Sequence, residues 1–126
     1  MKTIIYTENA PQPIGPYSQA VKVGELVFVS GQIPLDPETG ELVKGTVSEQ
    51  THIVFKNIEA ILNAADSSLD KVVKISVFLK DLADFEEVNQ VFELYFKSEH
   101  PARETVQVAR LPKDANVEIS VVAASE

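Results

Sequence analysis

The chain contains no cysteine, no long apolar run and no cluster of basic residues. The lack of cysteine excludes a disulfide framework, a thiol nucleophile and thiolate ligation of a metal, and it agrees with a reducing compartment. The longest apolar run has about four residues, whereas a membrane-spanning helix needs roughly 20. Residues 1–7 show neither an apolar signal core nor an amphipathic presequence rich in arginine and serine. We therefore expect a cytoplasmic protein without a membrane segment, with the mature part of an imported mitochondrial protein as the alternative.

The balance of charge argues against one class of partner. Nineteen acidic against eleven basic residues give a formal net charge of −8, which repels nucleic acid unless basic side chains gather locally. Hydrophobic residues make up 44% of the chain and charged residues 24%, which is typical of globular rather than disordered proteins. A chain of 126 residues is long enough for one domain with a single core, so residues 1–126 are expected to form one.

Hydrophobic periodicity predicts two helices. Thr46-Val47-Ser48-Glu49 fits a capping box, in which threonine and glutamate satisfy free amides at the start of a helix. Apolar residues then recur at helical spacing, so the first helix should run to about Ala65. The segment from Asp84 repeats the capping pattern and predicts a second helix that ends near Ser98. Its apolar face should consist of Phe85, Val88, Phe92 and Tyr95.

Three segments before the last quarter of the chain predict strands: residues 3–7, 26–30 and 72–80. The second should stop at Gly31, and Asp36-Pro37-Glu38-Thr39-Gly40 is typical of the turn of a hairpin. The third alternates with period 2, so one set of its side chains should share a buried face: Val73, Ile75, Val77 and Leu79.

The last quarter of the chain alternates on both sides of Pro112-Lys113-Asp114, which predicts a hairpin of two paired strands. In the register that matches the two apolar sets, Thr105 lies opposite Glu118 and Arg103 lies opposite Ser120. An arginine and an acid would then share one polar pocket. The apolar residues, which occupy every second position of the two strands, should face the core: Val106, Val108, Val117, Ile119 and Val121.

The predicted order is strands, helix, strand, helix and two strands. This order favours an α+β fold with both helices on one face of a mixed sheet. The other face should keep apolar side chains, including Phe28, Phe78 and Val122, which suggests that partner subunits cover it. We therefore expect a closed homo-oligomer.

Three groups of motifs together resemble the Rid family, the YjgF-type reactive-intermediate deaminases. The resemblance runs from about Thr7 to Ala124. It implies a chorismate-mutase-like fold, a homotrimer whose sheets form a central barrel, and active-site clefts between subunits. The residues that carry it are Ile14-Gly15-Pro16-Tyr17-Ser18-Gln19-Ala20, Phe28-Val29-Ser30-Gly31-Gln32-Ile33-Pro34, Pro101-Ala102-Arg103, Val108-Ala109-Arg110-Leu111-Pro112-Lys113-Asp114 and Val117-Glu118-Ile119.

The resemblance also implies a hydrolysis that needs no cofactor. The best known members of the family hydrolyse 2-iminopropanoate and 2-iminobutanoate, reactive products of pyridoxal-phosphate-dependent dehydratases, to 2-oxo acids and ammonia. This protects pyridoxal-phosphate enzymes from damage. A 2-imino acid is already electrophilic at its C=N carbon, so an enzyme has mainly to orient it, supply water and move a proton. His52 and His100 lack the spacing of metal ligands, so no metal is expected.

Four residues have candidate roles in this chemistry. Arg103 suits the substrate carboxylate, because its planar fork can hold both oxygens. Glu118 is the candidate for positioning the attacking water or relaying a proton. Backbone groups of Ser30 and Gly31 can bind the substrate nitrogen or water, since glycine lets the main chain come close to a ligand.

Three further residues are candidates for substrate binding. Tyr17 and Asn89 match positions that line the cleft in the family, where the site residues would come from two chains. Many members read Pro-Ala-Arg-Ser-Cys where this chain reads Pro101-Ala102-Arg103-Glu104-Thr105. Thr105 keeps a hydrogen-bond donor but removes the thiol. A required thiol is therefore excluded, and the preferred imino acid stays open.

Each candidate has a structural alternative, and the function has alternatives too. Arg103 can form a surface or intersubunit salt bridge, Glu118 can be a solvated strand residue, and Tyr17 or Ser30-Gly31 can simply pack a loop or end a strand. A trimer can also bind 2-oxo acids without turnover. Some family members have been described as ribonucleases, translation inhibitors or chaperone-like proteins, and the acidic charge disfavours RNA here.

Overall fold

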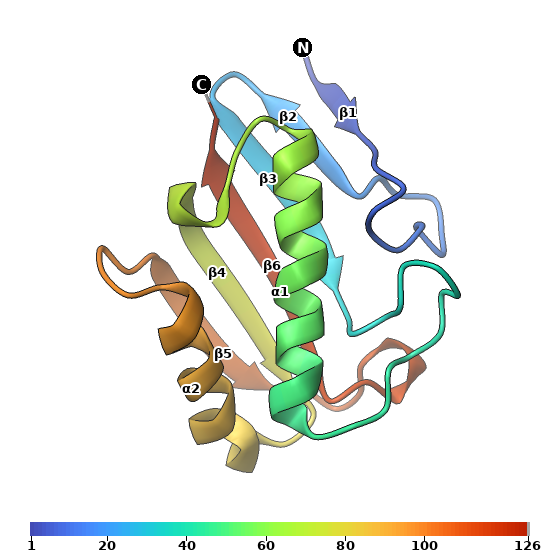
Figure 1. Cartoon of the computed structure of the whole chain (residues 1–126), viewed down its shortest axis with the longest axis vertical. Coiled ribbons are helices and arrows are strands. Elements are labelled where there is room, and N and C mark those ends of the chain that lie inside the picture. Colours follow the sequence, from blue (N-terminus) through green and yellow to red (C-terminus); the bar gives the residue numbers. More distant parts are fainter. Residues whose placement is uncertain (126) are drawn as a thin grey trace.

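In the computed structural model, which describes residues 1–125, six strands form one mixed sheet in the order β1-β2-β3-β6-β4-β5 (Figure 1). Neighbouring strands are antiparallel except β4 and β5, which are parallel and joined through a helix. The strands are β1 (Thr3–Ile5), β2 (Ala20–Val23), β3 (Leu26–Gln32), β4 (Val72–Leu79), β5 (Ala102–Gln107) and β6 (Val117–Ala124).

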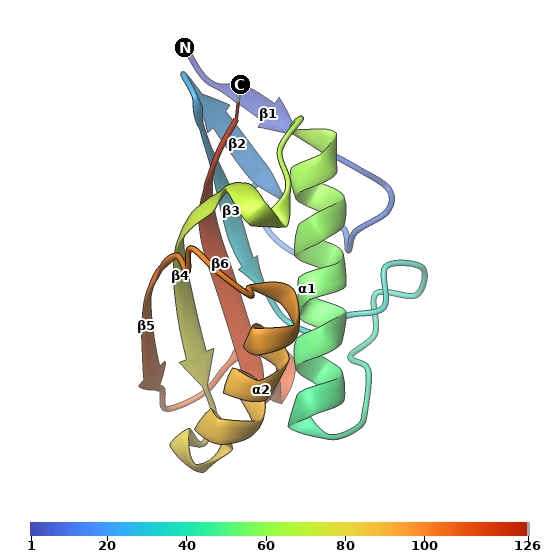
Figure 2. The ribbon, with the colours of Figure 1, turned by 60° about the vertical axis from the view of Figure 1, so that its left-hand side comes forward.

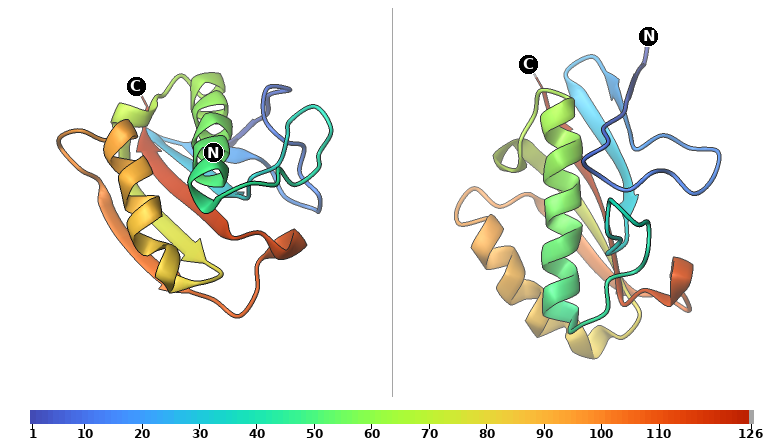
Figure 3. Two further views of the ribbon diagram at one scale, coloured as in Figure 1. Left: turned by 60° about the horizontal axis from the view of Figure 1, so that its bottom comes forward. Right: turned by 45° about the vertical axis from the view of Figure 1, so that its right-hand side comes forward.

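Two helices, α1 (Val47–Ala64) and α2 (Phe85–Tyr95), cover one face of this sheet (Figures 2 and 3). The predicted α+β fold with both helices on one face is therefore confirmed. Short 3-10 turns precede β4, α2 and β6, at Leu69–Lys71, Leu82–Asp84 and Pro112–Asp114.

Helix α1 begins and ends as the sequence predicts. The Thr46 side chain accepts a hydrogen bond from the Glu49 amide at 3.1 Å, and the Glu49 carboxylate accepts one from the Thr46 amide at 2.8 Å. This reciprocal pair is the capping box. The apolar side of the helix then packs on the sheet and forms the main core together with β3, β4 and β6, with its central residues fully buried: Val54, Phe55, Ile58, Ile61 and Leu62.

Helix α2 begins in a different way from the prediction. Asp84 makes no capping hydrogen bond with its side chain. Instead, the Asp81 carboxylate accepts a hydrogen bond from the Ala83 amide at 2.9 Å and caps the 3-10 turn that leads into the helix. The capping residue therefore lies one turn earlier than the Asp84 pattern indicated.

Helix α2 also ends earlier than predicted. It stops at Tyr95 rather than near Ser98, because Phe96 leaves the helical conformation. The Phe96 ring is 6% exposed and lies 5.6 Å from the Phe55 ring, measured between centroids. Burial of this aromatic ring against α1 decides where the helix stops.

The predicted C-terminal hairpin is wrong. Strand β5 pairs with β4, and β4 separates it from β6. The register places Arg103 and Thr105 opposite fully buried residues of β4, so these two side chains lie on the helix-covered face. Val106 is 42% exposed on the other face, and Val108 packs against a small separate cluster. Alternation defines two faces of a strand, but it fixes neither the covered face nor the neighbouring strand.

Two strands contain irregularities that the sequence did not reveal. Pairing of β3 with β6 slips after Val29, which makes Ser30 and Gly31 a bulge, and the strand continues to Gln32. A similar slip at the start of β4 leaves Val73 48% exposed instead of buried with its predicted neighbours. Side-chain alternation shifts wherever an extra residue interrupts the ladder.

The structure adds one strand that was not predicted and contains the predicted turn at residues 36–40. Strand β2, which pairs with both β1 and β3, was not predicted. The predicted turn at 36–40 is present, with the Gly40 amide donating to the Asp36 carbonyl at 2.8 Å. Its flanks join through a single bridge, between Leu35 and Leu42, rather than as a regular hairpin.

The sheet face opposite the helices carries exposed apolar side chains, as expected. Phe28 is 43% exposed, with the partly exposed Val122 opposite it, and Phe78 is partly exposed further along the same face, opposite Val106. Such a contiguous apolar surface is typical of a face that another subunit covers. Across residues 1–125, neither helix has the length and apolar character needed to cross a bilayer. Other exposed apolar residues of this face are Ile4, Leu26 and Val106.

Candidate active site

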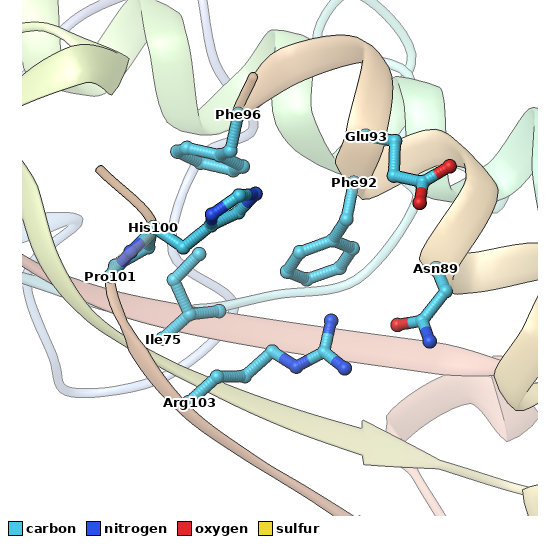
Figure 4. A pocket seen from close by; sticks show the side chains of 8 residues that line it. All are labelled: Ile75, Asn89, Phe92, Glu93, Phe96, His100, Pro101 and Arg103. Atoms are coloured by element: carbon cyan, nitrogen blue, oxygen red, sulfur yellow. The ribbon is translucent and has the colours of Figure 1, made fainter. Parts of the chain in front are cut away.

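A cavity of about 310 Å³ lies on the helix-covered side of the sheet, between β4, β5 and α2. Arg103 from β5 and Asn89 from α2 lie at one end of it, and the other end is mostly apolar (Figure 4). The residues that line it are Ile75, Asn89, Phe92, Glu93, Phe96, His100, Pro101 and Arg103.

Aromatic rings hold the Arg103 guanidinium by its face. The Cζ atom lies 4.7 Å from the centroid of the Phe92 ring and 5.5 Å from that of Phe85, within the range of a cation–π interaction. A carboxylate binds in the plane of a guanidinium, to its N–H edges. Stacking on the rings therefore orients the group and leaves its edges available to a ligand.

Arg103 has no carboxylate partner among residues 1–125. The ion pairs among residues 1–125 are Lys74 with Glu104 and Lys80 with Asp114, both at 3.0 Å. Glu104, the next residue along β5, points to the other face of the sheet. Partial burial lowers the pKa of Arg103, because the guanidinium loses hydrating water, yet arginine stays protonated in proteins. The salt-bridge alternative is thus absent within the described chain, and the site offers an unpaired cation to an external anion.

The cavity around Arg103 forms the first half of the site, and the structure places the two other residues predicted near it, Asn89 and Thr105, differently. Asn89 lines the cavity beside Arg103, whereas Thr105 lies further along the same face of β5 and does not line it. Sequence reasoning missed the aromatic wall, because Phe92 fits the apolar spacing of a core residue. Its position three residues after Asn89 was the available signal, since such pairs share a helix face.

His100 also lines the cavity, and it had been considered only as a metal ligand. Residues 1–125 contain no group of three or more histidine, aspartate or glutamate side chains arranged to hold a metal ion. The His100 ring forms part of the cavity wall next to Phe96 and Pro101 (Figure 4).

The second half of the site centres on Glu118. Its carboxyl group lies against Gly31, where the Cβ of any other residue would overlap it, so the close approach requires glycine. Burial raises the pKa of Glu118, because the charged form loses water. A carboxyl group with a raised pKa can both donate and accept a proton nearer to neutral pH. Glu118 is therefore suited to proton transfer, and its burial argues against the alternative of a solvated strand residue.

Tyr17 and Ser30 lie near Glu118. Tyr17, Gly31 and Glu118 all line a second, small cavity of about 50 Å³. Tyr17 is 48% exposed, and its hydroxyl accepts a hydrogen bond from the Ile14 amide at 3.3 Å. The Ser30 hydroxyl donates to the Ser18 carbonyl at 2.6 Å, and the Ser30 amide donates to the Gln19 carbonyl at 2.9 Å. Both Ser30 donors thus tie the N-terminal loop to β3.

The two halves do not meet within one chain. Side chains alternate across a strand, and Val117 and Ile119 of β6 are buried on the helix side, so Glu118 between them points to the opposite face. Arg103 points to the helix side. The prediction that both groups share one pocket of a hairpin is therefore wrong, since β4 separates the strands and the sheet separates the side chains.

The fold and this divided site define a class of protein: a mixed α+β sheet with a cationic half-site, centred on Arg103, on one face and an acidic half-site, centred on Glu118, on the other. The family model described as Endoribonuclease L-PSP matches residues 7–125. A RutC family protein of Pyrococcus abyssi is 57% identical over 125 residues, which cover 99% of this chain and 98% of that protein. Reactive Intermediate Deaminase A, chloroplastic, of Arabidopsis thaliana is 48% identical over 122 residues, covering 97% and 65%.

The fold of this chain also matches a solved structure. The crystal structure of E. coli TdcF with bound serine matches with a TM-score of 0.93 and 43% sequence identity, covering 98% of this chain and 99% of that one. The chain belongs to the Endoribonuclease L-PSP family, which confirms its resemblance to the Rid, or YjgF-type, proteins.

Proposed function

We propose that this protein is a cofactor-independent deaminase that hydrolyses 2-imino acids, such as 2-iminobutanoate and 2-iminopropanoate, to 2-oxo acids and ammonia. The observation that carries the proposal is the Arg103 guanidinium, which is oriented by aromatic rings and forms no ion pair with any residue of the part of the chain that the structure describes. A relative named a reactive intermediate deaminase supports the reaction. A structural neighbour that binds serine, which carries a carboxylate, supports the kind of ligand.

Arg103 binds the substrate carboxylate through two parallel N–H···O bonds, which fixes the position of the adjacent C=N carbon. The Asn89 side chain, at the same end of the cavity, supplies a further donor and acceptor for the polar end of the substrate. Because the reacting carbon is already electrophilic, orientation provides much of the rate.

Glu118 moves the protons. In its neutral form it donates a proton to the imine nitrogen, which makes the C=N carbon more electrophilic. The resulting carboxylate then accepts a proton from water as the water oxygen bonds to that carbon, giving a tetrahedral carbinolamine. Transfer of this proton to nitrogen lets ammonia leave as the C=O bond forms, and the Glu118 carboxylate accepts the hydroxyl proton, which restores its neutral form. One water is consumed and one ammonia released, with no change in oxidation state.

We propose that the site forms between subunits of a homotrimer. Arg103 and Glu118 lie on opposite faces of one sheet, so a complete site requires Glu118 from a neighbour. The apolar face around Phe28 gives the chains a surface to bury. In a closed ring, each subunit uses two different surfaces, so each contact can pair one half-site with the other.

A coupled assay tests the reaction. A threonine dehydratase generates 2-iminobutanoate, semicarbazide traps the free imine, and 2-oxobutanoate is followed with and without this protein. Wild type should accelerate formation of 2-oxobutanoate, and Arg103→Ala should reduce kcat/KM by about 100-fold or more, because two charge-assisted hydrogen bonds are lost. Arg103→Lys should recover only part of this loss, since lysine cannot form the paired contact.

Arg110→Ala is the matched control, because Arg110 is an exposed arginine outside both half-sites. Lack of acceleration by the wild type would refute the deaminase proposal for this substrate. Tight binding of 2-oxobutanoate with no ammonia release would instead favour a binding role. RNA cleavage that survives in Arg103→Ala would favour the ribonuclease alternative.

A further inference from the structure

The N-terminal loop, residues 7–18, forms part of the wall around Glu118 but has almost no regular structure of its own. Pro11 and Tyr17 from this loop line the small cavity that also contains Glu118. Within the loop, one hydrogen bond joins two backbone groups, from the Tyr17 amide to the Gly15 carbonyl at 2.9 Å. The prolines of the loop have no amide hydrogen to donate. Contacts other than backbone pairing must therefore hold this wall in place.

The buried side chain of Gln19 supplies these contacts. It is 2% exposed, and its Oε1 atom accepts a hydrogen bond from the Thr7 amide at 2.7 Å. Its Nε2 atom donates to the carbonyls of Thr7 at 3.0 Å and Pro11 at 2.9 Å, with the Ala10 carbonyl at 3.4 Å. A side-chain amide has two hydrogens to donate, and both are directed at the loop. Gln19 therefore has no donor left for a ligand, although it borders the cavity.

The backbone of Gln19 is joined to the bulge that contacts Glu118. The Gln19 carbonyl accepts a hydrogen bond from the Ser30 amide at 2.9 Å, and the Ser30 hydroxyl donates to the Ser18 carbonyl at 2.6 Å. Gly31, the next residue of the bulge, lies against the Glu118 carboxyl group. One residue thus connects two parts of the cavity wall, the loop through its side chain and the bulge through its backbone.

We propose that Gln19 is a positioning residue of the Glu118 half-site, which holds the N-terminal loop against the bulge and so keeps water away from the Glu118 carboxyl group. Its effect on catalysis rests on the deaminase function proposed above, whereas its effect on the surroundings of Glu118 does not. Gln19 acts through the loop and not on the substrate. Because Arg103 lies on the opposite face of the sheet, loss of Gln19 should impair proton transfer and leave carboxylate binding intact.

The first test separates kcat from KM. Gln19→Met keeps the size of the side chain but removes its hydrogen bonds. It should lower kcat for 2-iminobutanoate by about 10- to 100-fold, because a small displacement of a reacting group has a large effect on rate. KM should change by less than about twofold, since carboxylate binding is unaffected. Gln19→Asn, which keeps the amide on a shorter side chain, should lie between Gln19→Met and wild type.

Gln50→Met is the matched control, because it removes another buried glutamine amide. Gln50 is 3% exposed, donates to the Val43 carbonyl at 2.9 Å and accepts from the Asn116 side chain at 3.0 Å. Neither partner lines the cavity around Glu118. This variant should lower the melting temperature but change kcat by less than about twofold. A loss of kcat as large as that of Gln19→Met would indicate general destabilisation and overturn the positioning role.

A titration tests the same role without any activity. Burial raises the pKa of Glu118, and Tyr17 is the other titratable residue that lines its cavity. Lys80 at the end of β4 and Asp114 in the turn before β6 form an ion pair with each other. Gln19→Met should therefore move the pKa of Glu118 down toward the ordinary value of a glutamate, because water reaches the carboxyl group.

The titration is followed by NMR of the glutamate carboxyl carbons, with the Glu118 signal assigned from its absence in Glu118→Gln. Gln50→Met should leave the pKa of Glu118 at the wild-type value. If Gln19→Met does not fold, Gln19→Asn is titrated in its place. An unchanged pKa of Glu118 in the folded Gln19 variant overturns the proposal. If wild type hydrolyses no imine, the proposed function fails, and this titration still decides whether Gln19 positions the Glu118 half-site.

Discussion

Mixing two inactive variants tests whether each active site takes residues from two chains. In Arg103→Ala every site lacks the cation, and in Glu118→Gln every site lacks the proton-transferring carboxyl group. Each variant alone should lose about 100-fold or more of kcat/KM. The two half-sites point to opposite faces of the sheet, so an intact pair can arise only where an Arg103 of one chain meets a Glu118 of its neighbour.

The expected recovery follows from the geometry of a ring. In a three-fold ring with directional contacts, any trimer that contains both variants has one contact in which the chain with intact Arg103 meets the chain with intact Glu118. The variants are co-expressed with two different tags, and mixed trimers are isolated by two successive affinity steps. These trimers should show about one third of the wild-type kcat per trimer, with wild-type KM.

The control is Arg103→Ala carried on both tags, which should remain inactive through the same purification. Mixed trimers that stay at the activity of the parent variants would refute the reasoning, since a site built within one chain cannot be repaired by mixing. The same assay therefore tests the arrangement of the site independently of the preferred imino acid.

Three further perturbations follow from the structure. Gly31→Ala should reduce kcat about 10- to 100-fold with unchanged circular dichroism, because the added methyl group displaces the Glu118 carboxyl group; full activity would contradict the contact. Phe28→Asp should dissociate the assembly in sedimentation velocity, because it places a charge on the apolar sheet face. Leu94→Asp, at an exposed position of α2, should leave the assembly intact. An intact Phe28→Asp trimer would show that this face is not an interface. Burial raises the pKa of Glu118, so the folded chain holds that proton to a higher pH than the unfolded chain, and this residue makes stability fall as pH rises through the folded pKa. The melting temperature of Glu118→Gln relative to wild type should therefore rise between about pH 4 and about pH 7, and a falling difference would contradict the assignment.

The sequence predicted best the elements whose signals are local. The capping box at Thr46 and the apolar spacing that follows it define α1, because both depend on residues within a few turns of one another. The alternation of residues 75–79 likewise identifies β4. Arg103, Glu118 and Asn89 were found as candidates from their motifs, and the structure places Arg103 and Asn89 together in one cavity.

The pairing of β5 could not be read from the chain. Its alternation fits either face of a sheet, and only the crossover through α2 places it beside β4 with Arg103 on the helix side. The bulge at Ser30 and Gly31 and the contact of Gly31 with Glu118 also join segments that are distant in sequence.

The sequence by itself therefore determined the two helices and the central strands, and it supplied the candidate residues for the proposed site. The tertiary structure alone decided that the cation and the acid lie on opposite faces of the sheet. The physical reason is that residue type and spacing reflect local backbone preference and burial, whereas strand neighbours and covered faces result from the packing of the whole chain.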